Sequence, residues 1–317
     1  MPHKIIIDTD PGVDDTMAIF FALRSPELDL IGLTTIFGNV HTHLATTNAL
    51  RLLEIAGRTD IPVAHGADNP LTEPYLGPVP FVHGDDGQGN LHLPPPATKP
   101  IQPSAAQFIV DQIMRAPGEI TLIPVGPLTN IALALRLEPR IVQNVKQVVI
   151  MGGNAFCPGN ATPAGEANIH NDPEAADVVF GAGWPVTMVG LDVTHQVNMT
   201  RDHLARYAKA NNPLAQHIAR IVPHYQTYFE TFFPSMNGIY VHDSSAVAYV
   251  IDPTLFKTEQ WPVRVETQNF SRGKTWPCTN SERVPTPWQD RPLVNICVEV
   301  DSARLVALET GRLTGEE

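Results

Sequence analysis

The chain has 317 residues, of which 43% are hydrophobic and 17% charged, and 21 basic against 33 acidic side chains give a formal net charge of -12. These proportions are typical of a globular protein and exclude a disordered or fibrous one. The acidic balance removes the attraction for phosphate backbones on which sequence-independent nucleic-acid binding depends, so we expect no nucleic-acid partner.

We also expect no membrane partner and a cytoplasmic location. No apolar stretch approaches the ~18 residues that span a bilayer, and Asp8 and Asp10 interrupt the amino terminus before a signal-type apolar region develops. Cys157, Cys278 and Cys297 are widely separated and odd in number, which fits neither a disulfide framework nor a zinc site.

The first part of the chain alternates strand and helix patterns. A short apolar strand is predicted at residues 4–7, and a helical period follows over 13–24. Residues 28–37 again predict a strand, 44–56 a helix and 61–64 another strand. Successive β-α-β units of this kind predict a mainly parallel sheet.

Residues 66–103 are crowded with Gly, Pro, Asp and His, which predicts a long irregular connection, and loops of this length are usually functional or disordered. Regular patterns then return. They predict helices over 104–114 and 129–137 and strands over 120–125 and 145–151.

A further loop is predicted over residues 152–172, after which Pro173 stands where a helix would begin. Later helical patterns cover residues 200–210, 213–233 and 243–251, and a strand-rich tail with a short final helix follows. No change of composition marks a linker. We therefore predict an α/β fold, a single large domain over residues 1–317 with a mainly parallel, Rossmann-like central sheet flanked by helices, additional helices and a mixed C-terminal region.

Four carboxylates, Asp8, Asp10, Asp14 and Asp15, follow the first predicted strand, at the sheet edge where ligands bind in open α/β folds. Asp14 and Asp15 could simply complement a helix amino terminus, but this explains only two of the four. Crowding raises the pKa values of such groups unless a cation neutralises them, and oxygen ligands favour Ca²⁺ or Mg²⁺ over zinc. The cluster predicts a metal site with one carboxylate able to act as a general base.

The run Asp8-Thr9-Asp10-Pro11-Gly12-Val13-Asp14-Asp15 resembles the amino-terminal signature of the inosine-uridine preferring nucleoside hydrolase family. Other segments similar to this family follow in its order; they are residues 35–40, 83–87, 124–130, 151–153, 165–169, 172–175 and 241–243. The resemblance covers about residues 4–252. It implies a Ca²⁺-dependent N-glycosidase that hydrolyses ribonucleosides to free base and ribose in nucleoside salvage or catabolism, and a homo-oligomer, either a tetramer or a dimer.

The resemblance also implies roles for individual residues. Side chains of Asp10, Asp15 and Asp243 and the backbone carbonyl of Val125 would hold calcium. Ribose hydroxyls and water would fill the remaining positions, because Ca²⁺ accepts about 6 to 8 oxygen ligands. The groups that would hold the ribose are Asp14, Asn39, Glu166 and Asn168, and Asp243 would also bind the substrate.

Breaking a ribosyl C–N bond builds positive charge on the sugar, which a carboxylate-rich pocket stabilises. By the same resemblance, Asp10 would take the proton of water attacking the anomeric carbon from the face opposite the base, which predicts inversion. His242 would serve the departing base, since imidazole can donate near neutral pH. His83 matches a position in the inosine-uridine and pyrimidine-preferring branches, and the two histidines favour uridine and inosine as substrates.

Some residues and functions stay open. His224, Tyr225 and Tyr228 fall on a predicted helix where a base-binding flap would lie, although their spacing equally suits packing. Ala167 stands where many relatives carry an aromatic residue, which removes apolar surface from the expected ribose end.

Two other functions remain as alternatives. A Mg²⁺ phosphatase of the haloacid dehalogenase type is one, because Asp8-x-Asp10 resembles its nucleophile motif, although that family continues toward Gly-Thr and this loop supplies no cation for phosphate. A catalytically inactive Ca²⁺-dependent nucleoside- or ribose-binding protein is the other.

Overall fold

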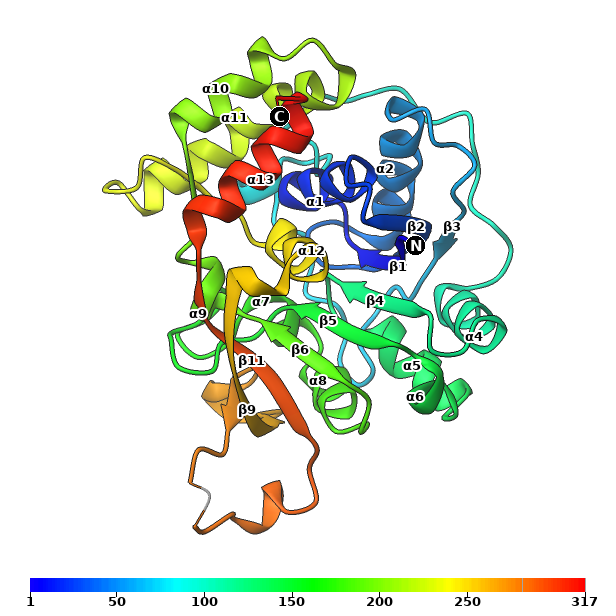
Figure 1. Cartoon of the computed structure of the whole chain (residues 1–317), viewed down its shortest axis with the longest axis vertical. Coiled ribbons are helices and arrows are strands. Elements are labelled where there is room, and N and C mark those ends of the chain that lie inside the picture. The colour runs from blue at the N-terminus through cyan, green and yellow to red at the C-terminus, as the bar shows by residue number, and fades with distance from the viewer. Residues whose placement is uncertain (281, 317) are drawn as a thin grey trace.

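In the computed structural model, which describes residues 1–280 and 282–316, one 9-stranded sheet has the order β10-β9-β11-β6-β5-β4-β1-β2-β3 (Figure 1). Its strands are β1 (His3–Thr9), β2 (Leu28–Thr35), β3 (Val63–His65), β4 (Ile120–Pro124), β5 (Gln147–Met151), β6 (Val186–Val189), β9 (Phe256–Val265), β10 (Thr275–Pro277) and β11 (Leu293–Val300). All pairings from β3 to β11 are parallel, whereas β9 pairs antiparallel with β11 and β10.

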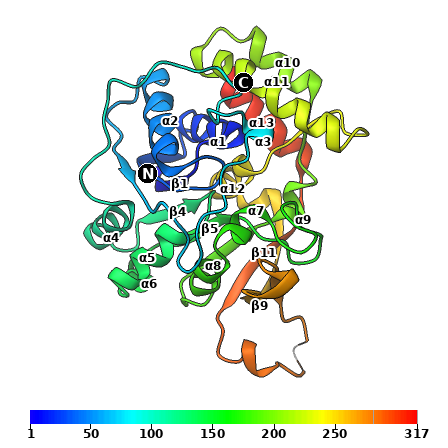
Figure 2. The ribbon, with the colours of Figure 1, turned by 180° about the vertical axis from the view of Figure 1, so that it is seen from behind.

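Helices cover both faces of this sheet (Figures 1 and 2). On one face lie α1 (Val13–Leu23), α2 (Thr42–Ile55), α12 (Asp243–Ile251) and α13 (Ser302–Thr314). On the other lie α4 (Ala105–Arg115), α5 (Thr129–Leu137), α6 (Ile141–Asn144) and α8 (Pro173–Phe180). Because helices pack on both faces of the sheet, the central strands are apolar on both sides.

Strand β1 shows how the sequence builds two cores. Ile5 and Ile7 belong to the cluster that packs against α1, while Ile6 belongs to the cluster on the opposite face. Successive side chains of a strand point to opposite faces, so an uninterrupted isoleucine run supplies both. These three residues are at most 1% exposed.

A second group of elements lies beyond the carboxyl ends of the strands. It comprises α9 (Leu191–Thr194), β7 (Asn198–Thr200), α10 (Arg201–Lys209), α11 (Pro213–Phe232) and β8 (Gly238–Tyr240). Strands β7 and β8 pair antiparallel in a separate 2-stranded sheet, and α11 packs against α1. Helix α11 is thereby held over the loops that leave the main sheet.

The predicted α/β fold with a mainly parallel sheet is confirmed. Ser281 and Glu317, which belong to the predicted domain, fall outside the described residues. Within the described ranges, no helix combines the length and apolar character needed to cross a bilayer.

The prediction was wrong at three short helices. The long loop 66–103 contains α3 (Pro80–His83), and the loop 152–172 contains α7 (Ala167–Asn171). Helix α6 lies between the helix predicted over 129–137 and the strand predicted over 145–151, where we predicted no element. One helical turn has too few residues to display a period, and its stability comes from tertiary contacts instead.

Candidate active site

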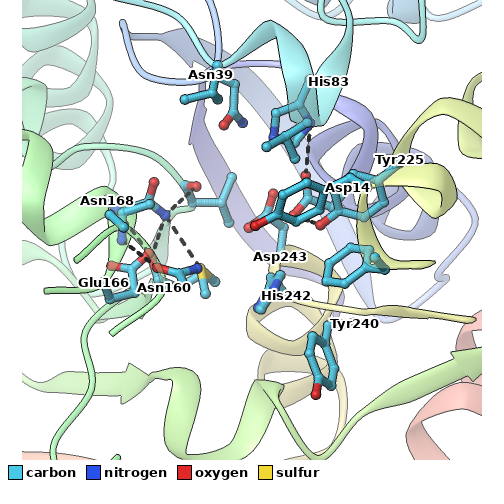
Figure 3. A pocket seen from close by; sticks show the side chains of 18 of the residues that line it. Asp14, Asn39, His83, Asn160, Glu166, Asn168, Tyr225, Tyr240, His242 and Asp243 are labelled. Carbon is cyan, nitrogen blue, oxygen red and sulfur yellow. Dashed lines mark hydrogen bonds and ion pairs between the residues drawn. The ribbon is translucent and has the colours of Figure 1, made fainter. Parts of the chain in front are cut away.

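A cavity of about 270 Å³ opens where β1, β4 and β5 end, and Figure 3 shows its lining. Polar side chains from the loops after β2 and β5 line one side, and aromatic side chains of α11 line the other. Asp14 and Asp243 lie between them. The cavity therefore combines the carboxyl edge of the sheet, where ligands bind in such folds, with the α11 region.

Three carboxylates converge at the floor of this cavity. Asp14, Asp15 and Asp243 each offer an oxygen within 4.8 Å of the others, in the arrangement that could hold a metal ion. Asp14 and Asp15 occupy the first turn of α1, and Asp243 is the first residue of α12. Because the positive ends of two helices meet here, the backbone favours negative charge at this point.

Burial raises the pKa of every carboxylate in the cluster. It raises the pKa of Asp14 to about 6 and, together with the charge of Asp15, raises that of Asp10 well above its usual range. Burial and the neighbouring charge of Asp14 raise the pKa of Asp15 and of Asp243. A cation would offset this cost, since ionised carboxylates at such distances repel one another.

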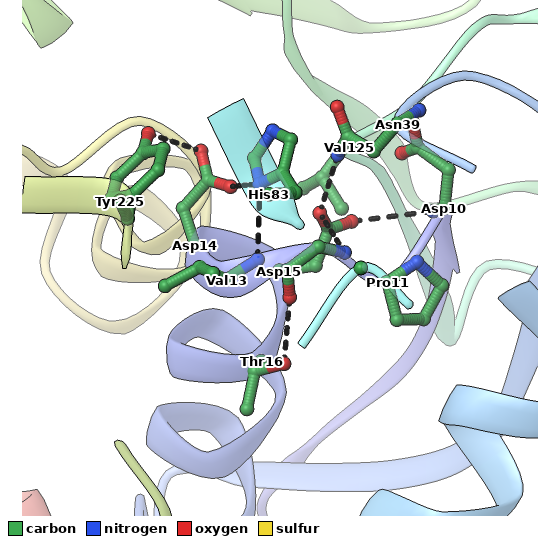
Figure 4. Close-up of polar contacts among 12 residues, drawn as sticks. Asp10, Pro11, Val13, Asp14, Asp15, Thr16, Asn39, His83, Val125 and Tyr225 are labelled. Atoms are coloured by element: carbon green, nitrogen blue, oxygen red, sulfur yellow. Dashed lines mark hydrogen bonds and ion pairs between the residues drawn. The ribbon is translucent and has the colours of Figure 1, made fainter. Parts of the chain in front are cut away.

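Asp15 is fixed by four hydrogen bonds, several of which Figure 4 shows. Oδ1 accepts from Thr9 Oγ1 at 2.5 Å and from the Asp10 amide at 3.2 Å. Oδ2 accepts from the Gly12 amide and from Asn39 Nδ2, both at 2.9 Å. Hydrogen bonds to the charged form favour ionisation, so Asp15 is held as an oriented carboxylate.

Asp10 is held at one oxygen only. Oδ2 accepts from the Asn39 amide at 2.5 Å, whereas Oδ1 is buried without a partner among the described residues. Oδ1 of Asp14 is in the same situation. Buried oxygens without partners are costly and rare, so these two atoms suit a bound cation or a substrate hydroxyl.

The carboxylates that converge are not the same set as the predicted metal ligands, of which Asp15 and Asp243 belong to it. Asp14, which we assigned to the ribose, belongs to the converging set, while Asp10 does not. The Val125 carbonyl accepts from Asn168 Nδ2 at 2.9 Å and has a second lone pair. The individual ligand assignments stay predictions.

Glu166 and Asn168, the predicted ribose contacts, organise the loop before α7. Glu166 caps this helix, accepting from the amides of Asn168 and Ile169, and also accepts from the Gly153 amide at 2.9 Å. Asn39 lines the cavity from the loop that follows β2. All three predicted side chains thus reach the polar side of the cavity.

The sequence prediction missed Asn160, which also lines the polar side. Its Oδ1 accepts from the Ala167 amide at 3.0 Å. An asparagine in a loop rich in glycine and proline carries no periodic signal, so only its position in the folded loop distinguishes it. Ala167 lines the cavity beside it, at the end predicted to bind ribose.

The aromatic side includes both histidines singled out from the sequence. His83 Nδ1 accepts from the Val13 amide at 3.2 Å, and its ring stacks on Tyr225 at 5.3 Å between centroids. Tyr225 donates to Asp14 Oδ2 at 3.1 Å. These contacts link the floor of the cavity to α11.

Burial lowers the pKa of His83 to about 4 and that of His242 to about 3. Both rings are therefore neutral near pH 7 and offer a single N–H hydrogen each. A neutral imidazole can still donate a hydrogen bond.

Of the three α11 residues whose role the sequence left open, two reach the cavity and one does not. Tyr225 and Tyr228 line the cavity, whereas His224 donates from Nε2 to the Pro80 carbonyl at 3.1 Å and holds α3. His195 and Tyr240 also line the cavity, and their rings lie 4.7 Å apart. The sequence analysis does not single out His195, because no motif surrounds it.

Comparisons with known proteins agree with this geometry. A family model described as inosine-uridine preferring nucleoside hydrolase matches residues 5–307, a range that includes the whole cavity lining. A relative named probable uridine nucleosidase 2, from Arabidopsis thaliana, is 49% identical over 313 residues, covering 98% of this chain and 97% of the relative.

Two further matches have similar coverage. An inosine-uridine preferring nucleoside hydrolase of Leishmania major is 45% identical over 304 residues, covering 95% of each chain. Among solved structures, a plant nucleoside hydrolase, the PpNRh1 enzyme, superposes with a TM-score of 0.96 at 42% identity and 99% coverage of both chains.

Proposed function

The chain belongs to the inosine-uridine preferring nucleoside hydrolase family, and on that premise we propose that it hydrolyses the N-glycosidic bond of ribonucleosides such as uridine and inosine. The observation that carries this proposal is the division of one cavity into a polar side, an acidic floor and an aromatic side. A ribonucleoside has the same division, with a hydroxyl-rich sugar joined to a flat base.

The acidic floor supports cleavage of the bond between sugar and base. Positive charge develops on the ribose as the C–N bond breaks, and Asp14 and Asp243 line the cavity as groups able to stabilise it. Within the described residues, no lysine or arginine lines the cavity, so a phosphate group would meet carboxylates and no permanently charged cationic side chain. This disfavours the phosphatase alternative.

We propose that the cluster holds Ca²⁺. The buried Oδ1 of Asp14, which lacks a partner among the described residues, and the convergence of Asp14, Asp15 and Asp243 fit a hard cation that accepts oxygen ligands. When bound, such an ion supplies positive charge that offsets the repulsion among the carboxylates and acts as a Lewis acid toward oxygen. Asp10, Asp15, Asp243 and the Val125 carbonyl would hold it.

Asp10 is the proposed general base. Its Oδ1 has no hydrogen-bond partner among the described residues and can accept the proton of the attacking water, while the Asn39 amide holds the other oxygen. Burial raises the pKa of Asp10, and a cation bound beside it would favour the ionised form that accepts a proton. Attack from the face opposite the base would invert the anomeric carbon.

The remaining predicted residues complete the binding of the substrate. Asn39, Glu166 and Asn168 would hold the ribose on the polar side. His83 and His242 would face the base and donate hydrogen bonds to it as it departs. We further propose a cytoplasmic role in nucleoside salvage or catabolism, which the free thiols of all three cysteines support.

The experiment that tests this function incubates the purified protein with uridine, inosine and cytidine, with and without a calcium chelator, and measures free ribose. Ribose release that stops with chelator and returns with added Ca²⁺ supports hydrolysis. Ribonucleoside binding without ribose release would favour the inactive binding protein, and release of phosphate from nucleoside monophosphates would favour the phosphatase.

The variant Asp10→Asn provides the matched control. It preserves the size of the side chain and is expected to lower kcat by about 10³-fold or more while ribonucleosides still bind. Near-wild-type turnover of this variant would contradict the assignment of Asp10 as the general base.

A further inference from the structure

Thr194, the last residue of α9, makes a direct contact with His242. Its Oγ1 lies 2.8 Å from Nδ1 of the imidazole, and the two residues are 48 positions apart in the chain. Thr194 is 0% exposed and His242 is 7% exposed, so the contact is shielded from solvent. Figure 3 shows His242 beside Asp243 and Tyr240 at the edge of the cavity.

The direction of this hydrogen bond follows from the partners available to the threonine hydroxyl. Threonines on other helices, such as Thr46 and Thr310, donate to the carbonyl four residues earlier. In the described part of the chain, Thr194 Oγ1 makes no such bond, and its one side-chain partner is His242 Nδ1. Because a buried hydroxyl hydrogen needs an acceptor, Thr194 is the donor and Nδ1 the acceptor.

A neutral imidazole that accepts at Nδ1 carries its hydrogen at Nε2. His83 is held in the same way, because the Val13 amide, which can only donate, occupies its Nδ1. In both histidines the nitrogen that carries the hydrogen is thus the one not engaged by the protein within the described residues.

Packing alone does not determine this tautomer. The ring of His195 meets that of His242 edge-on at 5.6 Å between centroids, and Tyr240 lies at 5.8 Å. These contacts restrict the plane of the imidazole but do not distinguish its two nitrogens. Among the residues that the structure describes, the hydroxyl of Thr194 alone makes that distinction.

We propose that Thr194 is a positioning residue that fixes the tautomer and orientation of His242, so that Nε2–H faces the departing nucleobase. This inference rests on the proposed function for its catalytic consequence. As charge passes from the breaking C–N bond to the base, a hydrogen bond already directed at the base stabilises the leaving group. If Thr194 did not fix the tautomer, some molecules would carry the hydrogen of His242 on Nδ1, and Nε2 would present a lone pair to the nucleobase instead.

The test compares Thr194→Val, which keeps the branched shape without the hydroxyl, with Thr194→Ser, which keeps the hydroxyl. Two types of substrate are compared. The first is a nucleoside, uridine or inosine; the second is 4-nitrophenyl β-D-ribofuranoside, whose nitrophenolate is stable enough to leave without a hydrogen bond from the protein. Thr194→Val is expected to lower kcat for the nucleosides about 10- to 100-fold, with KM changed less than about threefold. Its kcat for the nitrophenyl riboside should stay within about twofold, and Thr194→Ser should resemble wild type on both.

Two further variants separate positioning from a merely structural role. Thr310→Val removes another fully buried helical hydroxyl, one bonded to the Val306 carbonyl, and should not discriminate between the substrates. His242→Phe should show the same leaving-group dependence as Thr194→Val, and adding Thr194→Val to it should cause no further loss. Equal losses on both substrates, or no loss on either, would overturn the inference.

An NMR measurement that does not require catalysis tests this inference separately from the proposed function. Long-range ¹H–¹⁵N correlation spectra of the imidazoles, with His242 assigned through His242→Phe, should show hydrogen at Nε2 in wild type and Thr194→Ser and a mixture in Thr194→Val. Hydrogen at Nδ1 in wild type would refute the role of Thr194. Failure of the wild-type chain to cleave ribonucleosides, with Nε2 protonated as expected, would instead contradict the proposed function.

Discussion

Glu309 on α13 allows a sharp test of how this fold tolerates buried carboxyl groups. Its side chain is 0% exposed; Oε1 accepts from Ser244 Oγ at 2.9 Å, and Oε2 is buried without a partner among the described residues. Burial raises its pKa from an ordinary value of 4.5 to about 8. At neutral pH the folded protein therefore carries Glu309 as a neutral acid.

The sign of the effect on stability follows from proton binding. Between pH 4.5 and about 8 the folded state keeps this proton while the unfolded state has lost it, so stability falls as the pH rises. Each pH unit costs about 1.4 kcal/mol, which amounts to about 3 kcal/mol between about pH 5 and pH 7.5. Glu309→Gln cannot lose this proton, so it lacks this loss. The difference in free energy of unfolding between the variant and wild type should therefore shift by about 3 kcal/mol in favour of the variant between about pH 5 and pH 7.5.

Urea unfolding followed by intrinsic fluorescence, at several pH values between about 5 and 7.5, measures this difference. Asp8 and Asp14 also have raised pKa values, but they are present in both proteins and cancel in the comparison. Glu282→Gln, a change at an exposed glutamate, should give a curve parallel to wild type. If Glu309→Gln also ran parallel to wild type, the buried neutral acid would be refuted.

Three other substitutions test the site. Tyr225→Phe removes the hydrogen bond to Asp14 and should lower kcat/KM for uridine about 10- to 100-fold, the equivalent of about 1.5–3 kcal/mol; an unchanged value would contradict this contact. Gly38→Ala, at φ +154°, would place a Cβ against Asp10 Oδ2 and should lower kcat more than about 100-fold, whereas an active variant would show that Asp10 can move. Lys274→Met removes a buried ammonium that donates to the Asn154 and Cys157 carbonyls at 2.6 and 3.0 Å. Without it, KM for uridine should rise about threefold and the free energy of unfolding should fall by about 2 kcal/mol. Unaltered kinetics and thermal unfolding would show that Lys274 does not hold this loop.

The sequence predicted the features that are local in the chain. The strand at residues 4–7, the acidic run after it and the helix that begins at Val13 form one continuous segment, so a periodic pattern and a motif suffice to place Asp14 and Asp15 at the sheet edge. Asp243 was placed by family resemblance alone, since no local pattern connects it to that run.

The features that the sequence prediction missed depend on contacts between distant segments. Strand β11 pairs parallel with β6 and antiparallel with β9, yet its own residues indicate only a strand, not which neighbours it has. Asn160 and His195 reach the cavity because Asn160 lies on a folded loop and His195 directly follows the one-turn helix α9. A single sequence has no signal for such placements, because a side chain acquires its role only when tertiary contacts orient the backbone.

The acidic floor joins residues from opposite parts of the chain: Asp14 and Asp15 come from α1, Asp243 from α12, and these two helices pack together. During synthesis on the ribosome, a nascent polypeptide thus has its first carboxylates long before it has the last. The acidic floor can assemble only after α12 has left the exit tunnel, so a product terminated before α12 would lack Asp243 and the carboxylate it contributes.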